Sequence, residues 1–250
     1  MAAGSTLWTR IPAMQQQNHP PYTLAIAQGE SISLDPSHFT PEHWQALAAV
    51  TGTSKGRYTT WFVRHPEANQ DWVLRHYWRG GLMEKFSKDR YLYTGMANTR
   101  AIAELALLEK LHAEGFPVPR PVGARVRRYA LWYSADILIE RMPGCRDLLA
   151  WLEQGPLDEA EWKALGVCIA RFHHRGVYHA DLNAKNILKG PQGFALIDFD
   201  RGEIRNPANS WQQANLSRLR RSFDKEKGKL PSLAFDESCW QWLLEGYAAA

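Results

Sequence analysis

Hydrophobic and polar residues alternate in the first half of the chain in a way that predicts a β-sheet. Small residues lead into an alternating, β-prone run over 52–63, a turn follows at 69–71, and a second apolar run covers 72–77. Further β-prone runs lie at 129–133 and 136–140. Runs of this length bounded by turn residues are typical of strands. We therefore expect a hairpin and at least one further pair of strands.

Apolar residues recur at helical spacing in later segments. Residues 99–114 carry a broad apolar stripe that Gly115 ends, and residues 158–176 repeat the pattern from a capping pair, Asp158 and Glu161. Further helices are expected from Pro41, over 211–223, and over 236–247. By contrast, residues 15–21 contain a glutamine run and two prolines, which predicts a loop or a loosely held arm.

These elements predict an α+β chain with two lobes. A stiff, proline-rich connector follows the first long helix, and the strand at 136–140 runs into a Pro-Gly break, which suits a hinge. We expect an N-terminal extension over 1–45 without assigned chemistry, a β-rich lobe over 46–142, and a mainly helical lobe over 143–250.

Composition limits the class of protein. The 250 residues include 45% hydrophobic residues and 11 Trp, which indicates a well-filled core. The net charge of +4 is compatible with acidic ligands but is too weak to identify one. Cys145, Cys168 and Cys239 lack metal-binding spacing, so we interpret them as free thiols in a reducing cytosol.

The sequence also bears on the protein's location. The first 25 residues contain no long apolar run, and no stretch approaches the ~20 apolar residues that span a bilayer. We expect a soluble, cytoplasmic protein and leave contact with a membrane surface open.

The most informative stretch is residues 177–188, which contains His179, Asp181 and Asn186 and is followed by Asp198 after an apolar strand. Phosphoryl transfer to a hydroxyl needs a carboxylate beside the attacking oxygen and hard oxygen ligands for Mg²⁺. Asp181 suits the first role, and Asn186 with Asp198 suits the second. Loop aspartates commonly cap helices or build turns, but this joint pattern is far more specific than one aspartate.

The H-x-D-L-x-x-x-N signature with a following Asp-Phe-Asp resembles the catalytic and metal loops of the protein-kinase fold. The resemblance implies a bilobal, protein-kinase-like fold that binds ATP and Mg²⁺ between a small β-rich lobe and a helical lobe. We interpret His179 as a residue that orients the loop, and not as an acid or base.

Candidates for binding the nucleotide lie in the predicted β-rich lobe. Gly52, Lys55 and Gly56 form a glycine-bearing loop whose backbone N–H groups can approach phosphates. The loop departs from the full G-x-G-x-x-G pattern, and taken alone it is a weak signal. The backbone at Glu140, before the Pro-Gly break, is the expected contact for an adenine ring.

Arg75 occupies the strand position where protein kinases carry a lysine. Arginine is permanently charged and can bind two phosphate oxygens, and Glu104 in the first long helix is its predicted partner. Two alternatives stay open: Arg75 is an exposed strand charge, and Glu104 is a solvated helix residue. Lys85 and Lys55 are other cations that can serve the phosphates.

Two departures from protein kinases point to a different acceptor. Ala180 stands where those enzymes usually carry an Arg before the Asp, and no A-P-E motif follows Asp198. We expect a small molecule or a lipid-linked sugar as acceptor. A basic segment follows, with Arg218, Arg221 and Lys225 as candidates for holding an anionic headgroup or membrane. A solvated helix face is an equally good interpretation, and the segment lacks the interleaved aromatics expected for nucleic acid.

Six longer motifs narrow the resemblance. They lie at 74–82, 89–95, 117–121, 178–188, 196–201 and 215–222. Together they resemble the Kdo kinases of Gram-negative bacteria, within the lipopolysaccharide core heptose/Kdo kinase group, where Kdo is 3-deoxy-D-manno-octulosonic acid.

That resemblance implies ATP-dependent phosphorylation of the 4-hydroxyl of Kdo on Kdo–lipid A, with Asp181 as the active-site residue. It also implies a peripheral position on the cytoplasmic face of the inner membrane. Neither nucleic acid nor an obligate protein partner is expected. Two alternatives remain: another small-molecule kinase of the aminoglycoside type, and a non-catalytic, kinase-like nucleotide-binding module.

Overall fold

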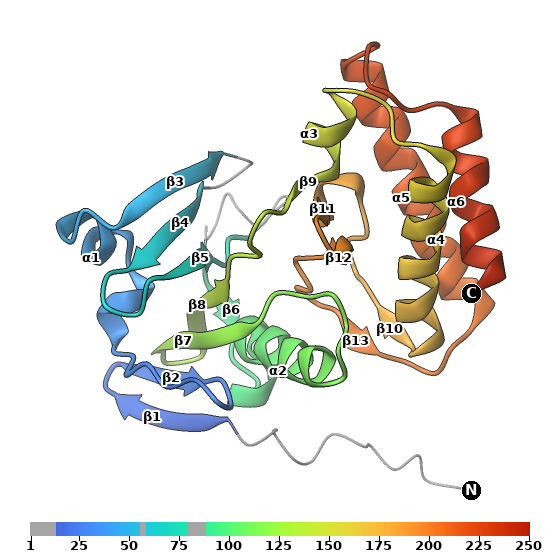
Figure 1. The fold of residues 1–250 in the computed structure, drawn as a ribbon. Helices are drawn as coiled ribbons and strands as arrows, with labels where there is room; N and C mark the ends of the chain where they lie inside the picture. Colours follow the sequence, from blue (N-terminus) through green and yellow to red (C-terminus); the bar gives the residue numbers. More distant parts are fainter. Residues whose placement is uncertain (1–13, 56–58, 80–88) are drawn as a thin grey trace, which may run out of the picture. The chain divides into compact units, whose positions relative to one another are not determined.

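The computed structural model describes residues 14–55, 59–79 and 89–250. The chain forms two compact units (Figure 1). The β-rich unit consists of Met1–Lys110 and Arg120–Arg141, and the helical unit consists of Leu111–Pro119 and Met142–Ala250. Strands dominate the first unit and helices the second, which confirms the predicted α+β class.

An antiparallel sheet forms the β-rich unit. Its described strands are β1 (Gln15–His19), β2 (Tyr22–Ile26), β3 (Val50–Lys55), β4 (Thr59–His65), β5 (Gln70–His76), β6 (Tyr91–Leu92), β7 (Pro121–Tyr129) and β8 (Trp132–Glu140). They are ordered β1-β2-β7-β8-β5-β4-β3, and β6 also pairs with β8. The predicted hairpin is confirmed as β4 and β5, which pair in register from Trp61–Leu74 to His65–Gln70.

Two sequence predictions about strands are wrong. Residues 15–21 form no loose arm, because β1 pairs along its whole length with β2 at the edge of the sheet. A strand at the edge of a sheet that faces water needs no apolar stripe. The polar sequence of β1 therefore gives no hydrophobic pattern from which a strand can be predicted. The run at 129–133 is not one strand either: Ala130, with a φ of 53°, and Leu131 turn the chain from β7 into β8.

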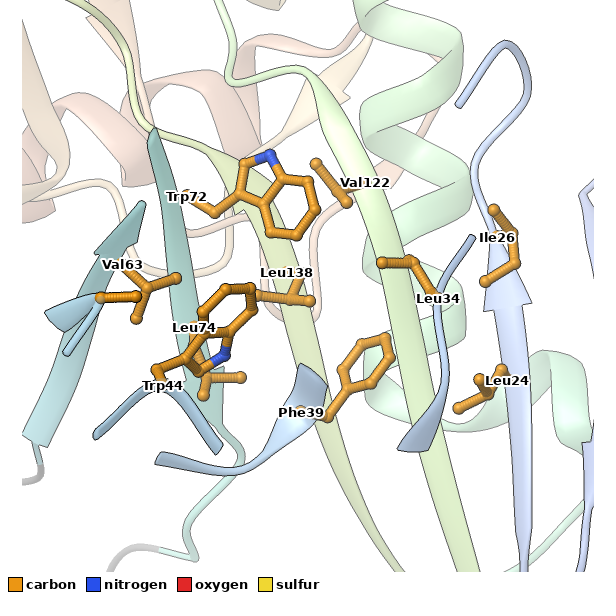
Figure 2. Packing of buried hydrophobic residues seen from close by; sticks show 11 residues of the cluster. Leu24, Ile26, Leu34, Phe39, Trp44, Val63, Trp72, Leu74, Val122 and Leu138 are labelled. Carbon is orange, nitrogen blue, oxygen red and sulfur yellow. The ribbon is translucent and has the colours of Figure 1, made fainter. Parts of the chain in front are cut away.

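Short helices cover one face of this sheet with aromatic side chains (Figure 2). The 3₁₀ helix η1 (Pro36–Phe39) and helix α1 (Pro41–Ala46), the latter predicted from Pro41, bring Phe39 and Trp44 onto β5, β7 and β8. Trp44 meets Trp72 edge to face at 5.8 Å, and both side chains are fully buried. Truncating such an aromatic to Ala costs about 3–5 kcal/mol, and Phe39 and Trp44 are both part of the core of this unit.

Helix α2 (Arg100–Ala113) follows the short 3₁₀ helix η3 (Met96–Asn98), close to the predicted bounds of 99–114. Its apolar stripe, including Ile102 and Leu105, is buried. Gly115, with a φ of 72°, ends the helix in the left-handed conformation that glycine adopts without a Cβ clash.

The helical unit contains α3 (Leu148–Leu152), α4 (Glu159–His174), α5 (Asn209–Lys229) and α6 (Glu237–Ala249). Short strands connect them: β9 (Arg146–Asp147), β10 (Val177–Tyr178), β11 (Ile187–Gly190), β12 (Gly193–Leu196) and β13 (Glu203–Ile204), with a 3₁₀ turn η4 (Ala184–Asn186). The predicted capping pair is confirmed, because Asp158 and Glu161 form a reciprocal capping box at the start of α4.

Helices α4 and α6 run side by side (Figure 1) at a distance that only glycine allows. A Cβ atom on Gly166 would lie 2.0 Å from the Leu243 carbonyl oxygen, and one on Gly246 would lie 2.1 Å from the Lys163 carbonyl oxygen. The two backbones are therefore in direct contact. Within the described ranges, every helix is too short or too polar to cross a lipid bilayer.

Candidate active site

The predicted catalytic loop lies between two small β-ladders of the helical unit. Strand β10 leads into the loop and pairs with β13, while β11 follows η4 and pairs with both β12 and β9. Strand β12 then carries the chain to Asp198. This arrangement brings the two acidic stretches of the sequence together, because β11 and β12 are antiparallel neighbours.

His179 anchors the loop from within the core. It is 2% exposed, its Nδ1 accepts a hydrogen bond from the Asp181 N–H (3.2 Å), and its Nε2 donates to the Ile197 carbonyl oxygen (3.0 Å). One ring nitrogen accepts while the other donates, which is the pattern of the neutral imidazole. Burial lowers the pKa of His179 and so favours the same neutral form. These contacts agree with an orienting role.

Asn186 closes the loop from its other end. Its Nδ2 donates to the Asp181 carbonyl oxygen (2.9 Å), and its own carbonyl oxygen accepts from the Ile197 N–H (3.0 Å). The first bond sets the orientation of the side-chain amide and directs Oδ1 away from the Asp181 carbonyl. Asn186 is only 9% exposed, so the amide is held in place.

The Asp181 carboxylate is oriented by two donors. Asn183 Nδ2 donates to its Oδ2 (3.1 Å), and an Arg218 guanidinium nitrogen donates to its Oδ1 (2.8 Å). The side chain is 49% exposed. A carboxylate that is fixed in direction and reachable from solvent can accept a hydrogen bond from an incoming hydroxyl.

Asp198 has an unusual backbone conformation. Its φ is 65°, in the left-handed region that costs a non-glycine residue about 1–3 kcal/mol. The next residue, Phe199, is fully buried against His179 and Phe172, with ring centroids 4.8 and 5.9 Å away. This packing compensates the strain. Strain of this kind concentrates at functional sites.

The donor set on these two segments fits Mg²⁺. A carboxylate from Asp198 and an amide oxygen from Asn186 are hard oxygen ligands, and Mg²⁺ is usually held by one or two such protein groups together with substrate phosphates. Within the described ranges, no cluster of three or more His, Cys, Asp or Glu side chains could hold a metal without such help. The site therefore suits a metal that arrives with a nucleotide.

Helix α5 supports the loop from one side. The Asn215 side chain accepts from the His179 N–H (3.3 Å) and donates to the His179 carbonyl oxygen (3.1 Å), and Ser222 Oγ accepts from the Ala184 N–H (2.9 Å). Sequence analysis missed Asn215, Ser222 and Asn183 as site residues. A polar residue at a position that helical spacing predicts to be buried, as at Asn215, is the signal that could have found them.

In the β-rich unit, the predicted pairing of Arg75 with Glu104 is present. The Arg75 guanidinium lies 2.5 and 2.6 Å from the two carboxylate oxygens, and the Tyr77 hydroxyl donates to the same carboxylate (2.6 Å). Glu104 is 1% exposed, so the solvated alternative is wrong for this residue. Arg75 is 19% exposed, so it is not an exposed strand charge either.

Three other predicted nucleotide residues of this unit, Gly52, Lys55 and Glu140, lie within the described residues. The Glu140 carboxylate accepts from Arg120 (2.6 Å), and the Glu140 N–H donates to the Arg120 carbonyl oxygen (2.8 Å). Gly52 lies in β3 next to a register irregularity, and Lys55 ends that strand. Gly56 and Lys85 lie outside the described residues.

A hollow of about 510 Å³ opens beside Asp181 in the helical unit. It is lined by Asp181, Asn183, Ala184, Lys185, Arg218, Arg221, Ser222, Lys225, Glu226 and Lys229. Arg218, Arg221 and Lys225, the three candidates from the predicted basic segment, therefore line the same hollow as the predicted catalytic carboxylate.

Comparison with known proteins adds to this geometry. Residues 41–247 match the model of the "Lipopolysaccharide kinase (Kdo/WaaP) family". Proteins named 3-deoxy-D-manno-octulosonic acid kinase are similar along most of their length. The one from Actinobacillus succinogenes is 42% identical over 84% of this chain and 89% of its own. The one from Mannheimia succiniciproducens is 43% identical over 84% of this chain and 90% of its own.

Among solved structures, the chain resembles one described as "WaaP in complex with acyl carrier protein", with a TM-score of 0.54. The match covers 91% of this chain and 89% of the other at 15% identity, so it bears on the fold alone. It confirms the predicted kinase-like fold. Together with the family match, these findings show that the chain is a phosphotransferase and belongs to the lipopolysaccharide kinase (Kdo/WaaP) family.

Proposed function

We propose that the protein transfers the γ-phosphoryl group of ATP to the 4-hydroxyl of Kdo on Kdo–lipid A. The observation that carries this proposal is that His179 and Asn186 each bond to both Asp181 and Ile197, the residue before Asp198, in a member of this kinase family. Relatives above 40% identity are named for Kdo, which supports the sugar. The position of the hydroxyl rests on resemblance.

The chemistry assigned to this chain's residues is simple. The acceptor hydroxyl donates a hydrogen bond to the Asp181 carboxylate, which orients the oxygen for attack on phosphorus and takes its proton as the new P–O bond forms. The bond from that phosphorus to the leaving phosphate oxygen breaks, and ADP leaves. Mg²⁺ held by Asn186 and Asp198 would supply positive charge to the phosphates.

Arg75 is the proposed phosphate contact of the β-rich unit. Its side chain is fixed by Glu104 and Tyr77, so little rotational freedom remains to be lost when a phosphate binds. Lys55, Gly52, Gly56 and Glu140 stay secondary candidates for the nucleotide, and Lys85 is a rival cation.

We also propose that the protein acts at the cytoplasmic surface of the inner membrane. An exposed apolar patch on the β-rich unit supports this: Leu92, Leu131 and Trp132 are 56, 70 and 40% exposed, and Leu92 pairs directly with Trp132. Arg128 lies at the rim, bonded to the Ala130 carbonyl oxygen. Apolar and indole side chains beside arginine suit the interface of an anionic bilayer.

A vesicle assay tests the location. Leu131→Asp should weaken co-sedimentation with vesicles of anionic phospholipid about tenfold, because a leucine side chain contributes about 1.5–3 kcal/mol when buried. Leu47→Asp is the matched control, since Leu47 is 49% exposed and lies in the connection between α1 and β3, outside the patch. Equal binding of the two variants would contradict this surface.

The reaction is tested by mass spectrometry of Kdo–lipid A after incubation with the protein and MgATP. We expect the mass of one added phosphoryl group, and phosphorus–proton NMR correlation should place it at the 4-hydroxyl. Asp181→Ala should slow the formation of product by about 10²–10⁴ while keeping its melting temperature. Transfer to an aminoglycoside but not to Kdo–lipid A would favour the other small-molecule kinase. Nucleotide binding without any transfer would favour the non-catalytic module.

A further inference from the structure

The hollow beside Asp181 is strongly basic on one side. Arg218, Arg221, Lys225 and Lys229 are spaced three and four residues apart, which places them on one face of α5. Lys185 adds a fifth cation from the loop. Among the described lining residues, the acids are Asp181 and Glu226 alone.

The two lining acids neutralise only part of this charge. Glu226 is paired with Lys229 (2.8 Å) and lies 3.6 Å from Lys185. Asp181 is paired with Arg218 (2.8 Å). The described lining thus holds five cations and two carboxylates, and its net charge is complementary to an anionic ligand.

The contact between Arg218 and Asp181 has a consequence for the reaction. Arg218 occupies Oδ1 of the carboxylate that the acceptor hydroxyl must reach. Both side chains are 49% exposed, and ion pairs in water at such exposure are weak. A second carboxylate that enters the hollow can therefore compete with Asp181 for the guanidinium.

We propose that Arg218 and Arg221 bind the carboxylate of a sugar-acid acceptor, an inference that rests on the proposed function. Arg218 leaves Asp181 when this acceptor binds. The guanidinium fork binds a carboxylate through two parallel hydrogen bonds. The same event frees Asp181 Oδ1 to accept the hydroxyl of the bound sugar. A neutral sugar lacks the group that releases Asp181, so the contact selects for acids.

The test pairs a change in the protein with a change in the acceptor. The acceptors are Kdo–lipid A and its carboxyl methyl ester, and the variants are Arg218→Ala and Arg218→Lys. With the wild type, the ester should lower kcat/KM about ten- to a hundredfold, the range for a lost hydrogen bond to a charged group. Arg218→Ala should lower kcat/KM for the acid by the same factor and should not lower kcat/KM for the ester any further. Arg218→Lys should keep part of the preference for the acid over the ester.

The matched control is Arg220→Ala, which removes the same charge from the same helix. Arg220 is paired with Asp224 and Glu237 and does not line the hollow. This variant should keep the wild-type ratio between acid and ester, with its melting temperature measured as a check on folding. An Arg218→Ala enzyme that also keeps the wild-type ratio would overturn the proposal.

A binding measurement separates this inference from the proposed function. Asp181→Ala removes the carboxylate that competes with the ligand for Arg218. The variant should therefore bind a Kdo glycoside about two- to fivefold more tightly than the wild type, as measured by calorimetry without nucleotide. Unchanged or weaker binding would overturn the exchange of partners. If the wild type binds the glycoside in this way but does not phosphorylate Kdo–lipid A, the proposed reaction fails and the carboxylate site stands.

Discussion

The contact of Arg75 with Glu104 allows a quantitative prediction about the β-rich unit. Glu104 is 1% exposed, and its two oxygens accept three hydrogen bonds from Arg75 and Tyr77. In Glu104→Gln, one of those oxygens becomes an NH₂ group that faces N–H or O–H donors. The variant keeps the volume of the side chain and loses its charge, so the effect reports the polar contacts and not a cavity.

The expected loss of stability follows from the burial of the pair. Breaking a buried ion pair costs about 3–5 kcal/mol, and we expect the lower end, about 3 kcal/mol, because Arg75 is 19% exposed and can recover some hydration. For a chain of this size, each kcal/mol lowers the melting temperature by about 2–4 °C. The variant should therefore melt about 6–12 °C below the wild type.

Thermal denaturation of Glu104→Gln beside Glu67→Gln makes the comparison, because Glu67 is exposed in the same unit and loses the same charge. The control should stay within about 0.5 kcal/mol of the wild type. In the proposed reaction, Glu104→Gln should also raise the KM for ATP about tenfold and leave the KM for the acceptor unchanged, since a mobile Arg75 binds phosphate less well. Equal melting of the two variants would refute the reasoning.

Three further predictions concern the helical unit. Asp181→Ala should lower kcat by about 10²–10⁴ in the transfer assay with a normal melting curve, and retained turnover would remove Asp181 from the mechanism. Gly166→Ala should destabilise the protein by about 3 kcal/mol in urea, because the new Cβ would lie 2.0 Å from the Leu243 carbonyl oxygen; a neutral effect would mean that α4 and α6 separate freely. Burial lowers the pKa of His173 from 6.5 to about 4, so the unfolded chain takes up a proton first as pH falls. Stability should therefore decline between pH 6.5 and pH 4, and His173→Gln should flatten that part of a urea-denaturation pH series; an unchanged pH profile would contradict the assignment.

Local patterns in the sequence determined much of the predicted catalytic loop and of the helices. His179, Asp181 and Asn186 lie within eight residues, and their mutual contacts are made inside that segment. The same holds for the capping box of Asp158 with Glu161, three residues apart. Short-range spacing is sufficient here because the backbone conformation of one turn or loop brings these groups together.

Only the tertiary structure decided which distant residues meet. Arg218 reaches Asp181 across 37 positions of sequence, and Glu104 reaches Arg75 across 29. The sequence alone left both basic residues between a functional and a solvated interpretation. Their pairing depends on how strands and helices pack, because the sequence around a charged residue does not indicate which distant residue it contacts.

The edge strand β1 and the α4–α6 contact illustrate the same division. The polar sequence of β1 shows no apolar stripe, since an edge strand in water obtains its stability from pairing with β2. Gly166 is one glycine in an ordinary helical pattern until α6 lies against it. The sequence by itself determined the local contacts of the predicted catalytic loop and most of the elements, whereas long-range packing decided what each distant charge and the helix glycines contact.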